Sequence, residues 1–205
     1  MENLTLIIPA KNERESLPKV LTELKEFKLK KVIILEKTDI TTIDAIKNFD
    51  CEILYQNNKG YGDAIIQGLN YIDTEYFCIF NADGSFNPKE LENMMNIIKS
   101  ENLDLIFASR YEKNCSSDDD TIITFIGNFL FTKLGKLLFN LNITDILYTF
   151  VLGKTFEVRS LNLKSKDFVF CIELPITAKR RGLKIDTSKS NERARFGDKK
   201  KSQCI

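Results

Sequence analysis

The chain has 205 residues with a formal net charge of +1, and 43% of the residues are hydrophobic. These values are typical of one soluble globular domain, with at most a small appendage, and they give no reason to expect nucleic-acid binding. Histidine is absent, which excludes Ser-His-Asp and Cys-His catalysis and zinc sites with histidine ligands. Acid–base chemistry is therefore left to carboxylates or lysines.

The cysteines and the first residues of the chain indicate the cellular compartment in which we expect the protein. The five cysteines are scattered, which indicates free thiols in a reducing environment. The first residues lack the basic region of a signal peptide, and no uninterrupted apolar run reaches the ~18 residues of a membrane span. We therefore expect a cytoplasmic protein, either free or bound peripherally to the cytoplasmic face of a membrane.

Strands and helices alternate through the first half of the chain. Short apolar runs predict strands at residues 4–8, 31–35, 52–56, 76–80 and 103–108. Apolar residues at helical spacing predict helices at 17–27, 40–49, 63–71 and 88–99. This alternation predicts an α/β domain with a mostly parallel central sheet flanked by helices.

The second half is less regular. A polar, acidic segment at 114–120 is the best candidate for a mobile loop, and a long apolar helix is predicted at 121–140. A strand or irregular segment is expected at 148–158, a helix at 168–181 and a strand at 183–186. The domain is expected to cover residues 1–190, and the basic residues 191–205 are expected to form a mobile tail.

The turn after the fourth strand carries the first candidate site. Asn81 and Asp83 follow a buried apolar run and lie one residue apart, so both side chains can face one ion. Their oxygens suit Mg²⁺ or Mn²⁺, and ligands of open α/β sheets bind at the carboxyl ends of strands. A plain strand-to-helix turn, with Pro88 opening the next helix, explains the same residues.

Further polar clusters follow the other predicted strands. They contain Glu13, Glu36, the Lys59–Gly60 loop and Arg110. Because the carboxyl ends of parallel strands meet at one edge, these residues could line one rim together with Asp83. Turn chemistry alone does not account well for five such clusters.

The order of these motifs resembles that of the family 2 glycosyltransferases, in particular the dolichyl-phosphate mannosyltransferases and bacterial polyprenyl-phosphate sugar transferases. The resemblance extends over about the whole chain. Its motifs lie at residues 8–13, 59–64, 81–85, 109–111, 127–128, 143–145, 173–174 and 195–197, with Lys199 and Lys200. It implies a GT-A fold, a UDP- or GDP-sugar donor, a divalent metal, Mg²⁺ or Mn²⁺, and inversion at the anomeric carbon.

The resemblance also implies roles for individual residues. Asp83 would hold the metal, with Asn81 beside it, and Asp145 would act near the acceptor as a candidate base. The residues expected to contact the nucleotide donor are Pro9, Ala10, Asn12, Glu13, Glu36, Lys59, Gly60, Arg110, Arg195 and Lys200. Simpler roles exist: Asp145 as a cap, Arg110 as an ion-pair partner, Glu173 as a partner of a buried arginine, and the basic residues as a solvated tail.

The sequence departs from the family pattern at three places. Leu35 and Glu36 stand where the family usually has an acidic pair, so only Glu36 can bond the base. Asn81 replaces the first metal-site acid. Thr149, Phe150 and Val151 occupy the place of a Gly-Phe-Arg motif on the acceptor side.

Two questions stay open at this level. The helix at 121–140 is either a core helix under the sheet or an interfacial helix whose Lys133 and Lys136 meet anionic headgroups. The leading function is sugar transfer to a polyprenyl-phosphate or glycan acceptor. The alternatives are a nucleotidyltransferase, which needs a glycine-rich loop that residues 9–13 lack, and a non-catalytic nucleotide-sugar-binding domain.

Overall fold

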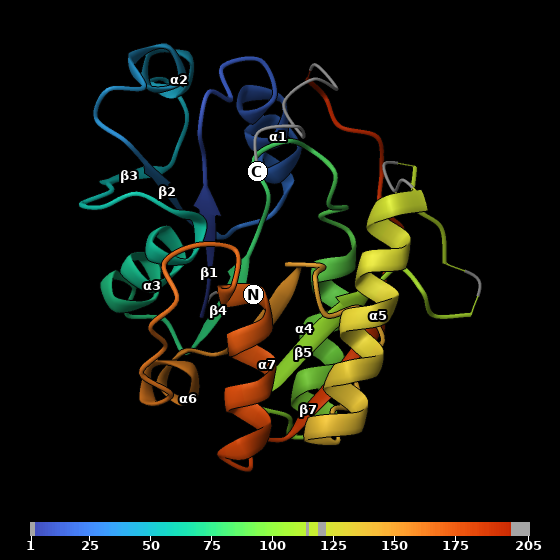
Figure 1. Cartoon of the computed structure of the whole chain (residues 1–205). Coiled ribbons are helices and arrows are strands. Elements are labelled where there is room, and N and C mark those ends of the chain that lie inside the picture. The colour runs from blue at the N-terminus through green and yellow to red at the C-terminus, as the bar shows by residue number, and fades with distance from the viewer. Residues whose placement is uncertain (1–2, 114, 119–121, 198–205) are drawn as a thin grey trace.

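Seven strands form one mixed sheet in the computed structural model, which describes residues 3–113, 115–118 and 122–197. The order across the sheet is β3-β2-β1-β4-β6-β5-β7. The strands are β1 (Leu4–Pro9), β2 (Lys30–Leu35), β3 (Glu52–Tyr55), β4 (Tyr76–Ile79), β5 (Leu105–Ser109), β6 (Val151–Lys154) and β7 (Ile185–Lys189). The predicted α/β domain with a mostly parallel sheet is confirmed (Figure 1).

One strand of the sheet runs against the others. The strand β6 pairs antiparallel with both β4 and β5, whereas all other neighbours in the sheet are parallel. The segment expected at 148–158 as a strand or irregular stretch is therefore a central strand followed by a short helix. The other strands all end at one edge, so the loops that follow β1, β2, β3, β4 and β5 share one rim.

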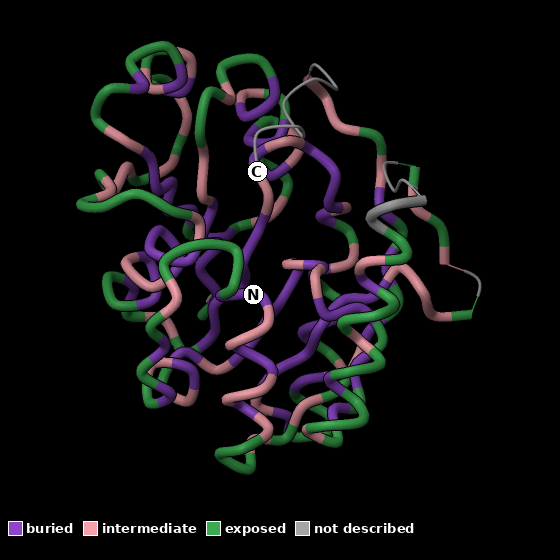
Figure 2. Tube along the Cα trace, in the orientation of Figure 1, coloured by how far each residue is buried: buried purple, intermediate pink, exposed green. Residues whose placement is uncertain are grey.

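Helices cover both faces of the sheet. They are α1 (Leu17–Glu23), the 3₁₀ turn η1 (Leu24–Glu26), α2 (Ile40–Ile46), α3 (Tyr61–Tyr71), α4 (Glu90–Ser100), α5 (Ile122–Phe139), α6 (Thr155–Ser160) and α7 (Phe170–Arg180). Side chains of α1, α2 and α4 join the apolar cluster on one face. Those of α3, α6 and α7 join the cluster on the other face, and Figure 2 shows the buried strands between the two layers.

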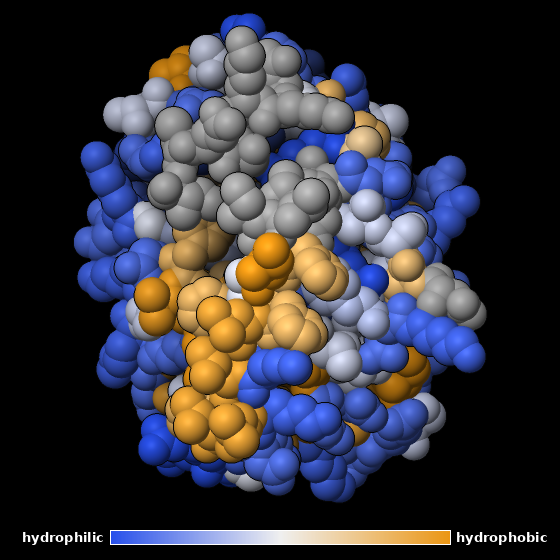
Figure 3. Space-filling model, turned by 45° about the vertical axis from the view of Figure 1, so that its right-hand side comes forward, coloured by the Kyte–Doolittle hydropathy of each residue, from blue (hydrophilic) through white to orange (hydrophobic). Residues whose placement is uncertain are grey.

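The helix α5 turns its small and polar side chains inward. Asn128 and Gly135 are buried against the body, and Thr132 Oγ1 accepts a hydrogen bond from the backbone of Ile146. The exposed side is apolar and contains Phe125, Ile126, Phe129, Leu130, Phe131, Leu134, Leu137 and Leu138. The interpretation of residues 121–140 as a core helix is therefore wrong, and Figure 3 shows an apolar patch on this side of the molecule.

The segment after β7 packs against the body of the protein. Residues 190–197 run back along the rim, where Arg193 donates to the carbonyl of Ser85 and Phe196 donates to that of Asp83. The loop residues 116 and 118 pair with the backbone of Glu192. Residues 191–197 and 115–118 make these contacts, and their mobility stays a prediction, while residues 198–205, with Lys199 and Lys200, lie outside the described part of the chain.

The glycines after β3 make room for another segment of the chain. A Cβ on Gly60 would lie 2.1 Å from the carbonyl oxygen of Lys166, and one on Gly62 would lie 2.2 Å from that of Ser165. Glu173 holds the incoming segment, because its carboxylate accepts the backbone N–H groups of Lys164 and Ser165. The glycine-rich loop is thus shaped by backbone packing, and Glu173 caps a loop instead of pairing with an arginine.

This packing gives a matched pair of substitutions. Gly62→Ala should lower the free energy of unfolding by about 1–3 kcal/mol, because the new methyl group meets a backbone carbonyl that cannot move easily. Gly127→Ala in α5 meets nothing within 4 Å and should be neutral or stabilising by up to about 1 kcal/mol. Urea denaturation of both variants measures the difference, and equal stabilities would contradict the packing at Gly62.

Candidate active site

The rim at the carboxyl ends of the parallel strands gathers most of the predicted site residues. Pro9 and Ala10 end β1, Glu36 follows β2, and Asp83 follows β4. A separate hollow of about 520 Å³ opens at the amino ends of β2 and β3, where Lys25, Lys31 and Asp50 help to line it. That hollow is at the opposite edge of the sheet, so we place the candidate site at the rim.

Ser85 fixes the turn that holds the candidate metal ligands. Its backbone N–H and its hydroxyl both donate to Asp83 Oδ1, at 2.9 and 2.7 Å, and its hydroxyl accepts from Asn81 Nδ2 at 3.4 Å. Ser85 is itself only 1% exposed. The side chains of Asn81 and Asp83 therefore both contact one buried hydroxyl, and their expected role as ligands of one ion stays a prediction.

The second carboxylate oxygen of Asp83 faces an arginine. Arg195 Nε lies 3.5 Å from Asp83 Oδ2, and the Phe196 ring lies against Gly84, which has a φ of 86°. Arg195 is thus brought to the metal turn by the packed C-terminal segment. The sequence motif predicted Arg195 to lie at the site, but it did not predict that Arg195 would pair with Asp83.

The donor set fits a metal that is brought in with a phosphate ligand. Within the described residues, no cluster of three or more histidine, cysteine or acidic side chains could hold an ion alone. Mg²⁺ and similar ions are commonly held by one or two carboxylates, with substrate phosphates and water completing the shell. Asp83 Oδ2 and the amide oxygen of Asn81 can supply the protein share.

The loop predicted to contact the nucleoside is hydrogen-bonded to the start of α2. Asn12 has a φ of 56°, and its backbone N–H donates to Asp39 Oδ2 at 2.7 Å. The backbone N–H of Glu13 donates to Thr42 Oγ1 at 2.9 Å, and Ser16 Oγ donates to the Glu13 carboxylate. The loop from Pro9 to Glu13 is therefore held in one conformation by these hydrogen bonds.

Asp39 supports this loop but was not singled out from the sequence. Its carboxylate caps α2 and accepts from Asn12, Thr41 and Thr42. Burial raises the pKa of Asp39, but these hydrogen bonds, led by that from Asn12, outweigh burial and hold the pKa below its ordinary value. An aspartate just before a helix with threonine three positions later is a capping signal that could have identified it.

Two further donor candidates lie at the outer rim. Glu36 is partly exposed, and Lys11 Nζ lies 3.6 Å from Glu36 Oε1. Lys59 and Gly60 are both exposed, and Gly60 lies close to the backbone carbonyl of Lys166. Glu36 and Lys59 are open to a ligand in this arrangement, and the main visible contact of Gly60 is with protein.

Arg110 and Asp145 form a buried pair instead of facing the rim separately. Arg110 donates from Nε and Nη2 to the two carboxylate oxygens of Asp145, at 2.8 and 3.1 Å. Its Nη1 reaches Glu192 Oε2 at 3.0 Å, and Asn128 Nδ2 donates to Asp145 at 2.8 Å. The predicted base, Asp145, is only 1% exposed, so an acceptor cannot reach its carboxylate in this conformation.

The pKa of Arg110 reflects this environment. Burial disfavours the charged guanidinium, but the hydrogen bond and charge of Asp145, with the charge of Glu192, raise the pKa above its ordinary value. Glu192 lies in the segment expected to be a mobile tail, and no local pattern predicts that it meets Arg110. In this structure Arg110 acts as a structural cation, which was the simpler of its two predicted roles.

Asp145→Asn tests how much this cluster contributes to the stability of the fold. The change keeps the shape of the side chain but removes one of the two carboxylates that face Arg110. We expect a loss of about 3 kcal/mol in the free energy of unfolding, because breaking a buried pair leaves a charge poorly compensated. Thermal and urea denaturation measure it, with Asp73→Asn, in an exposed pair with Lys30, as the control expected to change by less than ~1 kcal/mol. Equal losses in both variants would contradict a structural role for Asp145.

The chain is similar in sequence to several known proteins. An uncharacterized protein of Methanocaldococcus jannaschii is 23% identical over 192 residues, which are 90% of this chain and 79% of that protein. The low-salt glycan biosynthesis hexosyltransferase Agl6 of Haloferax volcanii is 22% identical over 69% of this chain and 36% of its own length. An uncharacterized glycosyltransferase of Mycobacterium tuberculosis is 28% identical over 45% of this chain and 42% of its own. The chain thus spans less than half of the latter two relatives.

A solved structure and a family model define the relationship. Glucosyl-3-phosphoglycerate synthase from Mycobacterium tuberculosis, in complex with Mn²⁺, UDP and glucosyl-3-phosphoglycerate, superposes with a TM-score of 0.75. The identity is 14%, and the match covers 95% of this chain and 72% of that one, which confirms the predicted GT-A-like fold. The model described as Glycosyl transferase family 2 matches residues 5–158. Because this match covers most of the chain, the chain belongs to glycosyl transferase family 2.

Proposed function

We propose that this chain transfers a hexose from a UDP- or GDP-sugar to a lipid-phosphate acceptor, with inversion and with help from Mg²⁺ or Mn²⁺. The observation that carries the proposal is the Asp83 turn. It places one oriented carboxylate and one arginine together at the carboxyl end of β4, in a family member whose structural neighbour binds Mn²⁺ and UDP. The carboxylate would hold the metal, and the metal and the arginine would together offset the negative charge of a leaving nucleoside diphosphate.

The donor is assigned to the rim between β1, β2 and β4. Pro9, Ala10, Asn12 and Glu13 would contact the nucleoside, and Glu36 would accept N–H groups of the base. A metal on Asp83 would offset charge on the leaving diphosphate, and Arg195 would donate hydrogen bonds to its oxygens. The acceptor oxygen then bonds to the anomeric carbon from the side opposite the bond to the diphosphate as that bond breaks.

The buried state of Asp145 favours an acceptor that needs no base. A sugar hydroxyl must lose a proton as it attacks, whereas a lipid phosphate already carries an ionised oxygen. The carboxylate predicted as the base is engaged by Arg110 and Asn128. We therefore prefer the phosphate acceptor to the glycan, and we assign Asp145 the role of positioning Arg110.

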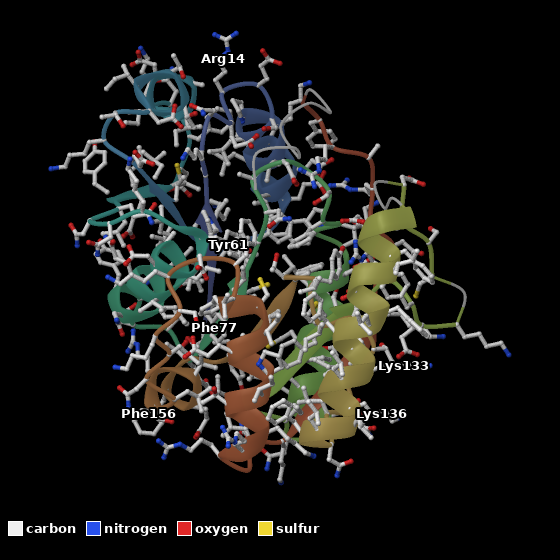
Figure 4. All side chains as sticks on the ribbon, viewed as in Figure 1. Arg14, Tyr61, Phe77, Lys133, Lys136 and Phe156 are labelled. Carbon is white, nitrogen blue, oxygen red and sulfur yellow. The ribbon has the colours of Figure 1, made fainter. Side chains whose placement is uncertain are left out.

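The exposed apolar side of α5 supports a membrane-bound acceptor. Leu137 and Leu138 are 80% and 65% exposed, and the only charges between residues 121 and 139 are Lys133 and Lys136 (Figure 4). An apolar face with flanking lysines suits a surface of anionic lipid. The helix would lie on that surface, since no described helix is long and apolar enough to cross a bilayer.

The non-catalytic alternative rests on Asn81 and Leu35, which replace two acids of the family pattern. Ser85 nevertheless contacts both Asn81 and Asp83, which supports a shared role of these two side chains. The nucleotidyltransferase alternative has no such support, because the loop from Pro9 to Glu13 contains no glycine. We therefore retain only sugar transfer and test it against binding without turnover.

The metal assignment is tested with Asp83→Ala and Asn81→Asp. Asp83→Ala should abolish Mn²⁺-dependent UDP or GDP binding without unfolding the protein, because the residue lies in a rim turn. Asn81→Asp should tighten Mn²⁺ binding by adding a second carboxylate. Calorimetric titrations with Mn²⁺ and each nucleotide measure both, and donor hydrolysis distinguishes an enzyme from a binding domain. Unchanged Mn²⁺-dependent affinity in Asp83→Ala would place the metal elsewhere.

The lipid assignment is tested with vesicles. Leu137→Asn combined with Leu138→Asn should weaken binding to phosphatidylglycerol vesicles by at least about tenfold. Each leucine would bury its exposed apolar side chain in the membrane, and asparagine would not gain that free energy. The control is Phe156→Asn in α6, which is 77% exposed but lies on the far side of α7 (Figure 4). Sedimentation with anionic and neutral vesicles separates the two, and equal binding by all variants would contradict the proposal.

A further inference from the structure

The C-terminal segment is anchored on one side of the metal turn by Arg193. Its guanidinium forms two hydrogen bonds to the Glu23 carboxylate, at 3.0 and 2.8 Å, and a third to the carbonyl of Phe86 at 2.7 Å. Its backbone N–H donates to the carbonyl of Ser85 at 2.9 Å. The chain is therefore tied at residue 193 to both α1 and the turn.

A second anchor follows at Phe196. Its backbone N–H donates to the carbonyl of Asp83 at 2.8 Å, and its ring covers Gly84 so closely that a Cβ there would lie 2.3 Å from it. Lys19 Nζ lies 6.0 Å from the centre of the same ring. The two anchors hold the residues between them against the metal turn.

Arg195 lies between these anchors and meets the oxygen that a metal would use. Ser85 already donates twice to Asp83 Oδ1, which leaves Oδ2 as the less engaged oxygen of the carboxylate. Oδ2 is the atom that lies 3.5 Å from Arg195 Nε. An arginine and a divalent ion would therefore compete for one oxygen.

We propose that Arg195 is a resident cation of the metal site, which neutralises Asp83 before the donor binds and moves to the diphosphate when the metal takes Oδ2. The proposal rests on the proposed function, in which Asp83 holds the metal. Two positive charges at one carboxylate repel each other, so metal binding alone must displace the guanidinium. A diphosphate that arrives with the metal offers Arg195 a new anionic partner, so metal and donor favour each other's binding.

The exchange needs only a side-chain movement. The backbone on both sides of Arg195 is fixed by hydrogen bonds from residues 193 and 196, and neither bond involves the Arg195 side chain. Arg195 is about one-third exposed, so its guanidinium has solvent on one side. The anchors would keep it beside the diphosphate after it leaves Asp83, which a freely moving tail could not do.

Arg195→Gln gives opposite expectations for two titrations. Mn²⁺ alone, followed by the electron paramagnetic resonance signal of the free ion, should bind about three- to tenfold more tightly, because the competing charge is gone. UDP or GDP titrated at saturating Mn²⁺ should bind at least about tenfold more weakly, because a charge-assisted contact is lost. A purely structural role for Arg195 would weaken both, and a role on phosphate alone would leave Mn²⁺ binding unchanged; either outcome overturns the proposal.

Two controls isolate the cause. Lys19→Gln removes a nearby positive charge that contacts the carbonyl and ring of Phe196 but not Asp83, so it should change Mn²⁺ affinity by less than about twofold. A change as large as that of Arg195→Gln would show a general field effect and would count against exchange. If Asp83→Ala leaves Mn²⁺ affinity intact, the proposed function fails; if it abolishes binding while Arg195→Gln does not tighten it, only the exchange fails.

Discussion

One buried guanidinium connects the parts of this molecule that the sheet alone does not hold. Arg110 follows β5 and pairs with Asp145, from the loop after α5, and with Glu192, from the C-terminal segment. Asn128 attaches α5 to the same cluster through Asp145. Two carboxylates facing one guanidinium are tolerable only because further N–H and hydroxyl groups donate to them. The position of α5, the path of the C-terminal segment and the closure of the rim all depend on this arrangement.

The parallel half of the fold could be predicted because its signals are local. Apolar runs and helical spacing up to Arg110 each report on their own element, and alternation then fixes the sheet type. The strand β6 was harder to predict, because the short segment Val151–Lys154 is stabilised as a strand by pairing with the distant strands β4 and β5. The apolar character of α5 suggested burial, whereas the small and polar residues Asn128, Thr132 and Gly135 are the ones that face inward.

The sequence predicted which residues lie at the rim better than it predicted which side chains they contact. Asp83 and Asn81 both contact Ser85 in the turn after β4, and the Pro9–Glu13 loop lies at the same rim. Composition suggested a solvated tail, but Arg193 and Glu23 meet across most of the sequence, and such pairing leaves no local pattern. The same holds for Glu192 and for the segment packed on Gly60 and Gly62. The roles of the individual donor residues remain predictions.

The position of β6 also has a consequence for how the chain folds as it is synthesised. The strands β4 and β5 do not pair with each other. Each pairs with β6, which follows β5 by some forty residues along the chain. The first half can close β1, β2, β3 and β4 early, but β5 has no partner strand until residue 151 is available. Such distant pairing slows folding and leaves apolar strand edges open in the meantime. We therefore expect the part of the rim that follows β5 to form after the part that follows β1, β2, β3 and β4.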